Sequence, residues 1–252
     1  MSSLKSSIVF LVCAGIFMLH HGIQASDKFK VSSDFSQTYN KIDKLEIENV
    51  TGQVKFVGWG KDEVKVYYIK KARNRHDLDN LEVDIYEEGD RLIIETDYPR
   101  NCRGCAIDFV ISVPKTFESI NAQTVTGSIE LSRLEQVTDL DLECTTGSIN
   151  GDFSCQDIHC KVVTGGINLT LNNLPKDHNI NLTSVTGGIT LNAPANLDSE
   201  VNLQAVTGSI HTDFGVTTQG EIKRNHLEGT IGNGKGMISI STTTGSITLK
   251  RL

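Results

Sequence analysis

Val125–Thr126–Gly127–Ser128–Ile129 is a stretch that recurs, with few changes, towards the end of this 252-residue chain. From Gly127 onward, the glycines of consecutive copies lie between 16 and 22 residues apart. A period near 20 residues is typical of a solenoid, in which each repeat is one coil that buries its apolar face only against neighbouring coils. The other copies are an early outlier at Val50–Val54, then Thr145–Ile149, Val163–Ile167, Val185–Ile189, Val206–Ile210, a degraded Leu227–Ile231 and Thr243–Ile247.

Apolar residues keep the same distance from each repeated glycine, with few exceptions. They stand seven, five and two residues before it and two and four residues after it. A spacing of two within each half of the coil predicts short strands, and glycine suits the bend between them. We therefore expect an all-β protein of about 20-residue coils, with Val125 and its counterparts directed inward. The expected buried stack is Ile129, Ile149, Ile167, Ile189, Ile210 and Ile247.

The chain divides into three expected segments. Residues 1–25 form a predicted signal peptide, residues 26–119 a first coil with an antiparallel strand meander, and residues 120–252 the solenoid repeats. An atypical terminal unit such as the meander covers one open end of a solenoid, and Lys250 and Arg251 should blunt the other end with charge. The strands expected in the meander are Glu63–Lys71, Leu81–Tyr86, Arg91–Asp97 and Ala106–Val113.

The N-terminus has the charge and length of a secretory signal. Lys5 precedes the apolar run Ile8–Leu19, and cleavage is expected after Ala25, so that the mature chain begins at Ser26. The run holds 12 residues, whereas a membrane span needs about 20. We therefore expect an exported protein of the periplasm, cell envelope or exterior.

Composition excludes several function classes. The net charge is −7 and the lysines and arginines are scattered, whereas a nucleic-acid-binding protein carries a basic stripe. The sequence contains no phosphate-binding loop, no nucleophile elbow and no calcium-binding nonapeptide. We therefore expect no cofactor and no catalytic residues.

Cysteine usage fits an exported chain. Cys102 and Cys105 form a C-x-x-C turn ahead of a predicted strand, and we expect a structural disulfide there. The alternative, a redox-active pair, requires a helix N-terminus to lower a thiol pKa. Five cysteines follow the expected cleavage site, so at least one thiol is unpaired in a monomer. The pairing of Cys144, Cys155 and Cys160 stays open.

One group of ionisable residues is a candidate binding site. Asp139 and Asp141 alternate on the outward side of one strand, and Asp157 and His159 hold the same offsets from glycine one coil later. In-register stacking places Asp141 beside His159, sets Asp139 against Asp157 as like charges, and pairs Glu143 with Lys161. We expect surface ion pairs here. The alternative is a weak metal site or an acid–base patch made of Asp139, Asp141, Asp157 and His159.

Beyond the repeats, four further matches suggest a known family. They are Leu45–Val54, Gly58–Val64 and Gly89–Leu92, together with the strand end at Val113–Pro114. With the Thr-Gly-Ser-Ile repeats, the chain resembles a bacterial envelope family of unknown function that carries the label "putative adhesin". The resemblance implies a right-handed parallel β-solenoid, and it carries no catalytic motif.

Two functions remain open at this point. The first is a non-catalytic, adhesin-like or scaffold protein that binds a glycan or an envelope protein through one face of the solenoid. The second is a carbohydrate-active β-helix enzyme, a hydrolase or lyase, which needs paired carboxylates, or a metal and a base, in a cleft. The scarcity of aromatic residues in the coils favours the first.

Overall fold

In every repeat except the one around Gly229, one stretch of strand precedes the glycine and another follows it. The computed structural model describes residues 29–102, 104–218 and 223–252, and within them the chain is all-β apart from the short helix α1 (Arg75–Asp79). The signal peptide expected at residues 1–25 lies outside the described residues. The strands are β1 (Val31–Asn40), β2 (Lys44–Thr51), β3 (Val54–Trp59), β4 (Glu63–Ala72), β5 (Glu82–Glu88), β6 (Arg91–Asp97), β7 (Ala106–Pro114), β8 (Thr116–Thr126), β9 (Ile129–Thr146), β10 (Ile149–Thr164), β11 (Ile167–Leu171), β12 (Asn179–Thr186), β13 (Ile189–Ala193), β14 (Ser199–Thr207), β15 (Ile210–Thr212), β16 (His226–Ile231), β17 (Gly236–Thr244) and β18 (Ile247–Arg251).

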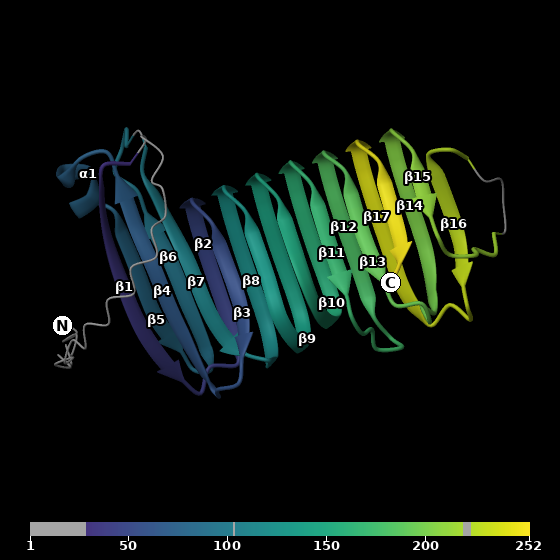
Figure 1. Ribbon diagram of the computed structural model, residues 1–252, viewed down its shortest axis with the longest axis horizontal. Helices are drawn as coiled ribbons and strands as arrows, with labels where there is room; N and C mark the ends of the chain where they lie inside the picture. Colours follow the sequence, from purple (N-terminus) through teal and green to yellow (C-terminus); the bar gives the residue numbers. More distant parts are fainter. Residues whose placement is uncertain (1–28, 103, 219–222) are drawn as a thin grey trace, which may run out of the picture.

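Neighbouring coils pair in register through parallel strands. Thr126 pairs with Thr51 on one side and with Thr146 on the other, and Ile129 pairs with Val54 and Ile149. The result is one large mixed sheet drawn out into a rod (Figure 1). We call the strands before the repeated glycines the pre-glycine strands; in spatial order they are β2, β8, the second halves of β9 and β10, β12, β17 and β14. The post-glycine strands are β3, the first halves of β9 and β10, β11, β13, β18 and β15.

The order of the coils in space differs from their order in the sequence. Strand β17 pairs with β12 on one side and β14 on the other, and β18 lies between β13 and β15. Figure 1 shows this directly, since yellow β17 stands between the green strands β12 and β14. The last repeat is therefore inserted inside the rod. The expectation that Lys250 and Arg251 close the end of the solenoid is wrong.

The degraded repeat around Gly229 is not a coil, which corrects a second expectation. Its strand β16 pairs antiparallel with β14, with Asn202 opposite Glu228. Gly229 also lacks the positive φ angle of the glycines at the coil bends. This segment therefore covers the outer edge of β14 at the end of the rod.

At the other end, the expected meander is continuous with the coils. The four strands expected between residues 63 and 113 are present as β4, β5, β6 and β7, and β4 pairs antiparallel with both β1 and β7. However, β6 and β7 also pair in parallel with β2 and β3. The sequence pattern did not reveal β1 or α1, because alternation is weak before residue 43 and the helix is a single turn.

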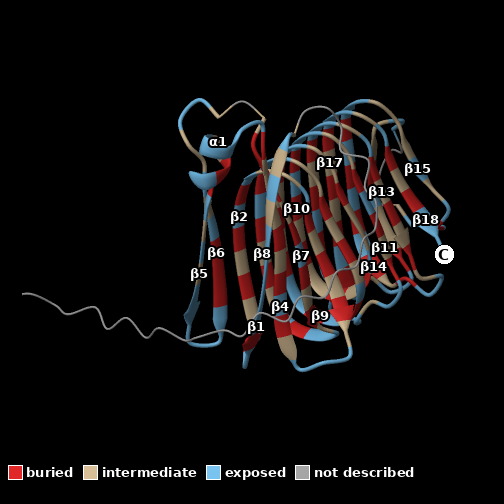
Figure 2. Cartoon of the chain, turned by 60° about the vertical axis from the view of Figure 1, so that its left-hand side comes forward, coloured by how far each residue is buried: buried red, intermediate tan, exposed pale blue. Residues whose placement is uncertain are grey.

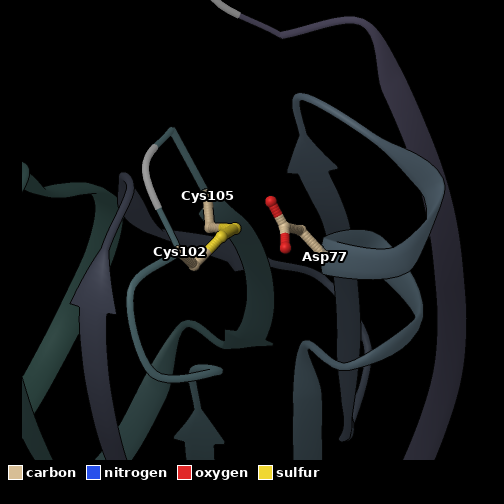
Figure 3. Close-up of side chains that lie close together, drawn as sticks. All are labelled: Asp77, Cys102 and Cys105. Carbon is tan, nitrogen blue, oxygen red and sulfur yellow. A yellow bond between two sulfur atoms is a disulfide. The ribbon is translucent and has the colours of Figure 1, made fainter.

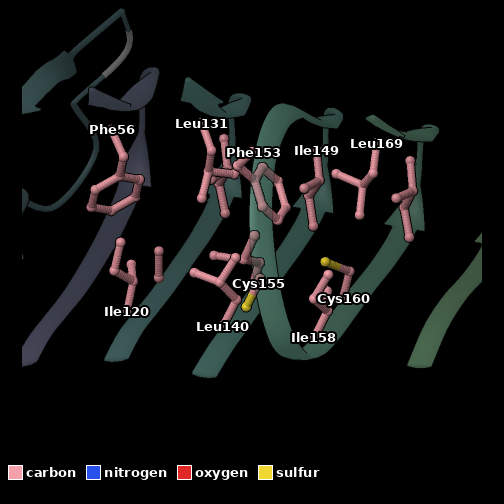
Figure 4. Close-up of a cluster of buried hydrophobic side chains, with 14 of the residues drawn as sticks. Phe56, Ile120, Leu131, Leu140, Ile149, Phe153, Cys155, Ile158, Cys160 and Leu169 are labelled. Carbon is pink, nitrogen blue, oxygen red and sulfur yellow. The ribbon is translucent and has the colours of Figure 1, made fainter. Parts of the chain in front are cut away.

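The core lies between the pre-glycine and post-glycine strands. Buried and exposed residues alternate along almost every strand (Figure 2). Ile129, Ile149, Ile167, Ile189 and Ile247 are at most 1% exposed, while Ile210, at the end of the column, is only partly buried. Figure 4 shows two facing rows of core side chains, with Phe56, Leu131 and Leu169 from the post-glycine strands opposite Ile120, Leu140 and Ile158.

One expected inward position is wrong. Val125, two residues before its glycine, is 49% exposed, and Val206 is 65% exposed. The residue three before each glycine is buried instead, as Thr124 and Val162 show. The alternation of buried and exposed residues thus continues along the pre-glycine strand as far as Thr124. The four residues of the bend, 125–128, then lie outside the core before Ile129 points inward again.

Candidate functional site on the pre-glycine strands

The outward side of the pre-glycine strands forms a broad surface, which we call the pre-glycine face. It consists of the residues eight, six, four and two positions before each glycine. The first three columns are mostly polar, whereas the column two before is mostly exposed valine, such as Val125 and Val206. The column six before is, in spatial order, Glu46, Asn121, Asp141, His159, Asn181, Ser239 and Asn202. The column four before is Glu48, Gln123, Glu143, Lys161, Thr183, Ser241 and Gln204. Parallel pairing in register therefore produces rows of amide, hydroxyl and charged groups.

Within this face the structure brings Asp141 and His159 together. The two residues are direct partners on β9 and β10, as the spacing predicts. Atoms of Asp141, Glu143 and His159 that could bind a metal lie within 4.8 Å of one another. Lys161 Nζ lies 3.5 Å from Glu143 Oε1, so this expected ion pair is present. Asp141 and His159 are neighbours, but among the described residues they form no ion pair within 4.0 Å. This triad is half-buried and open to solvent on one side.

Asp139 and Asp157 also face each other on these strands, but they lie outside the triad. Burial raises the pKa of the Asp139 carboxyl, and the charge of Asp141 raises it further, against the effect of His159. Burial likewise raises the pKa of Asp157, with Asp139 the next largest cause. Like charges on directly opposite residues destabilise a sheet, so Asp139 and Asp157 concentrate negative charge on this part of the face.

Glu143 belongs to this cluster, although the sequence indicated only an ion pair for it. The signal that could have found it is its spacing: it stands two residues after Asp141, and residues two apart share one face of a strand. Its carboxylate therefore projects beside Asp141 while Lys161 reaches it from the next coil.

A second feature of the pre-glycine face is a groove of about 760 Å³ near the end of the rod. Strands β14, β16 and β17 line it, with Glu200, Asn202, Glu228, Met237 and Ser239 among its residues. His226 Nε2 lies 3.8 Å from Glu228 Oε2 within it. The sequence pattern missed this groove because it assigned the β16 segment to a coil, whereas the antiparallel pairing places Glu228 beside Asn202.

Cys102 and Cys105 form a disulfide, in the loop that joins β6 to β7. Figure 3 shows Asp77 of α1 directing its carboxylate towards the two sulfur atoms. Since the sulfurs are bonded to each other, they are not available as thiolate ligands for a metal. Cys144, Cys155 and Cys160 are buried free cysteines, and Cys144 Sγ donates a hydrogen bond to the carbonyl of Gly127. The three thiols therefore belong to the buried core.

Comparison with models of known protein families shows to which family this chain belongs. The model of the family described as Toastrack DUF4097 matches residues 14–250. The chain belongs to this family. This confirms the resemblance drawn from the repeats and the flanking matches. No curated protein matches the chain.

One solved structure supports the fold. A "putative cell adhesion protein" from Clostridium sporogenes ATCC 15579 has a TM-score of 0.54 and 15% identity, covering 88% of this chain and 100% of its own. A "putative adhesin" from Bacteroides fragilis NCTC 9343 has a TM-score of 0.45 and 12% identity, covering 88% of this chain and 98% of its own. At these identities the first likeness shows a shared fold, and the second is too weak to carry an argument.

Among the described residues, no helix is long and apolar enough to cross a membrane.

Proposed function

We propose that this protein is an exported, non-catalytic binding protein that holds a glycan or an envelope protein on its pre-glycine face. The observation that carries the proposal is the groove of about 760 Å³ at the end of that face. Its volume lies within the range of about 300–1,000 Å³ typical of ligand sites. Asn202, Ser239 and Glu228 supply donors and acceptors for hydroxyl groups, and the exposed Met237 supplies an apolar contact.

The rest of the face suits an extended ligand. Asn121, Asn181 and Gln204 project amides at regular positions, and adjacent strands of a sheet lie about 4.8 Å apart. A polymer of sugar units or an extended protein segment can therefore meet several coils at once. The C. sporogenes structure carries a cell-adhesion label, which accords with this class of function, although the proposal rests on the face.

The test is binding to a glycan array and to envelope extracts, with variants of the groove. Asn202→Ala and Glu228→Gln should weaken binding, whereas Asn168→Ala, an exposed change on the outward side of β11, should leave it unchanged. Equal binding by all three variants would place the ligand elsewhere.

The second candidate function is a carbohydrate-active enzyme, because two carboxylates, Glu200 and Glu228, line the same groove with His226. Glycoside hydrolysis requires such a pair. Incubation with polysaccharides distinguishes the two functions. Product release by the native chain that is abolished in both Glu200→Gln and Glu228→Gln would replace the binding proposal by the enzymatic one.

We also infer a right-handed winding of the coils, so that the protein is a right-handed parallel β-solenoid. Connections between parallel strands are right-handed in almost all known cases.

The proposal that the protein is exported depends on the signal peptide expected at residues 1–25. Mass spectrometry of the secreted protein should find Ser26 as its first residue.

A further inference from the structure

Asp141, Glu143 and His159 lie on the pre-glycine face but do not line the groove, and they offer a second set of donors there. Asp141 and Glu143 stand two apart on β9, so both project from one face, and His159 stands opposite Asp141 on β10. The atoms that could bind a metal lie within 4.8 Å of one another. Two carboxylates and one imidazole, from two adjacent coils, therefore converge on one point of the pre-glycine face.

A second observation at the same place points to a missing partner. Oδ1 of Asp141 is buried and accepts no hydrogen bond from any described residue. A buried polar atom without a partner costs free energy, and in native structures it calls for a specific explanation such as a bound ion or water. Asp139 and Asp157 lie beside each other on the same two strands and add further negative charge.

We propose that Asp141, Glu143 and His159 form a zinc-binding site that bridges the neighbouring strands β9 and β10. Imidazole and carboxylate oxygens are common zinc ligands, and three protein ligands leave one position of the tetrahedron open. Zinc–ligand bonds of about 2.0–2.2 Å draw the three donors closer than they now lie, and rotation of these half-exposed side chains supplies the movement. Calcium is a poorer match because it binds through six to eight oxygen atoms.

Lys161 is the competitor in this site. Its ammonium lies 3.5 Å from Glu143 Oε1 and neutralises the carboxylate that the metal needs. Zinc binding must displace it. Removal of the lysine charge should therefore strengthen zinc binding, an outcome that a purely structural ion pair does not produce.

The test is isothermal titration of zinc chloride into the mature, untagged protein, with calcium chloride in parallel. One zinc ion should bind per chain. Asp141→Asn, Glu143→Gln and His159→Gln should each weaken binding by at least about tenfold, the lower end of the loss seen when even an indirect partner of a metal ligand is removed. Lys161→Gln should tighten binding severalfold.

Two matched controls separate the site from general surface effects. His211→Gln removes an exposed histidine from β15, and Lys115→Gln removes another lysine that is ion-paired to a glutamate. Both should bind zinc as the native chain does. Replacement of zinc by cobalt(II) provides a visible absorption band that should disappear in His159→Gln.

Three results would overturn the proposal. They are the absence of zinc binding by the native chain, zinc binding that persists in His159→Gln at native affinity, and a site that takes calcium and is indifferent to His159. Circular dichroism of each variant checks that it is folded, which is expected because all three side chains lie on the outward face. Loss of zinc binding leaves the glycan or protein function intact if that function resides in the groove, so the two proposals fail separately.

Discussion

The carbonyl oxygen of Gly127 would lie 1.5 Å from a Cβ atom added to Gly147. The same contact recurs along the rod, since a Cβ on Gly165 would lie 1.6 Å from the carbonyl oxygen of Gly147. These glycines also have φ angles of +148° and +136°, which side chains disfavour. The repeated glycine is therefore required for two reasons. Its own φ angle is positive, and the backbone of the neighbouring coil leaves no room for a Cβ atom.

Gly147→Ala should destabilise the protein by about 3 kcal/mol or more. Backbone strain contributes about 1–3 kcal/mol, and displacement of the neighbouring backbone adds about 1–3 kcal/mol. Urea unfolding measures the change. The control is Gly60→Ala, where a Cβ has no neighbour within 4 Å. Similar midpoints for the two variants would show that the glycine column is not tightly packed.

Ile189→Ala should cost about 2–5 kcal/mol as a large-to-small change in a core. Ile189 is fully buried and stacks between Ile167 and Ile247. Ile210→Ala should cost less, because Ile210 ends the column and is partly exposed. Thr190→Ala, on the outward side next to Ile189, should cost little. Equal losses for Ile189 and Thr190 in thermal unfolding would contradict this register.

Val162 and Val163 are neighbours in the chain but opposite in environment. Val162 is fully buried and Val163 is 39% exposed. Val162→Asp should destabilise by about 3 kcal/mol or more because it buries an unpaired charge. Val163→Asp should cost about 1 kcal/mol or less, within the span of strand propensities. Chemical unfolding of the pair decides which of the two positions faces the core.

The three free thiols should be unreactive in the folded state. Burial raises the pKa of Cys155 to about 12 from its ordinary value of 9.0, and it also raises the pKa values of Cys144 and Cys160. A thiol reagent at pH 8 should therefore label none of them until denaturant is added. Rapid labelling of the native protein would show that this part of the core opens readily.

The same shifts predict loss of stability in alkali. Because the folded state holds these protons more tightly than the unfolded state, their contribution is fully present below about pH 9 and declines as the pH rises towards 12. Tyr39, whose pKa burial raises to about 12, acts in the same direction. Cys155→Ala should show a shallower decline between pH 9 and 11 in urea unfolding. An unchanged slope would mean that other groups dominate.

Most of the coil could be predicted from the sequence, because its strands and bends depend on local residue patterns. Alternation with a period of two predicts a strand, and a glycine at a constant offset predicts a bend, because both depend on residues close in the chain. The same offsets place Asp141 opposite His159, since parallel coils repeat in register. The error at Val125 arose at the bend, where the number of residues passing outside the core depends on backbone angles that apolar spacing does not reveal.

The sequence by itself determined the all-β class and, away from the bend and the Gly229 repeat, the register of the strands and the residues on each face of a coil. Only the tertiary structure decided which coil stacks on which. All coils after the first present an isoleucine at the same position, so Ile189 packs equally well on Ile247 or Ile210, and the local pattern cannot select between them. The insertion of β17 beside β14, with β16 turned antiparallel on the other side of β14, is a long-range arrangement that buries all of these faces at once. The groove at Glu228 exists only because of that arrangement.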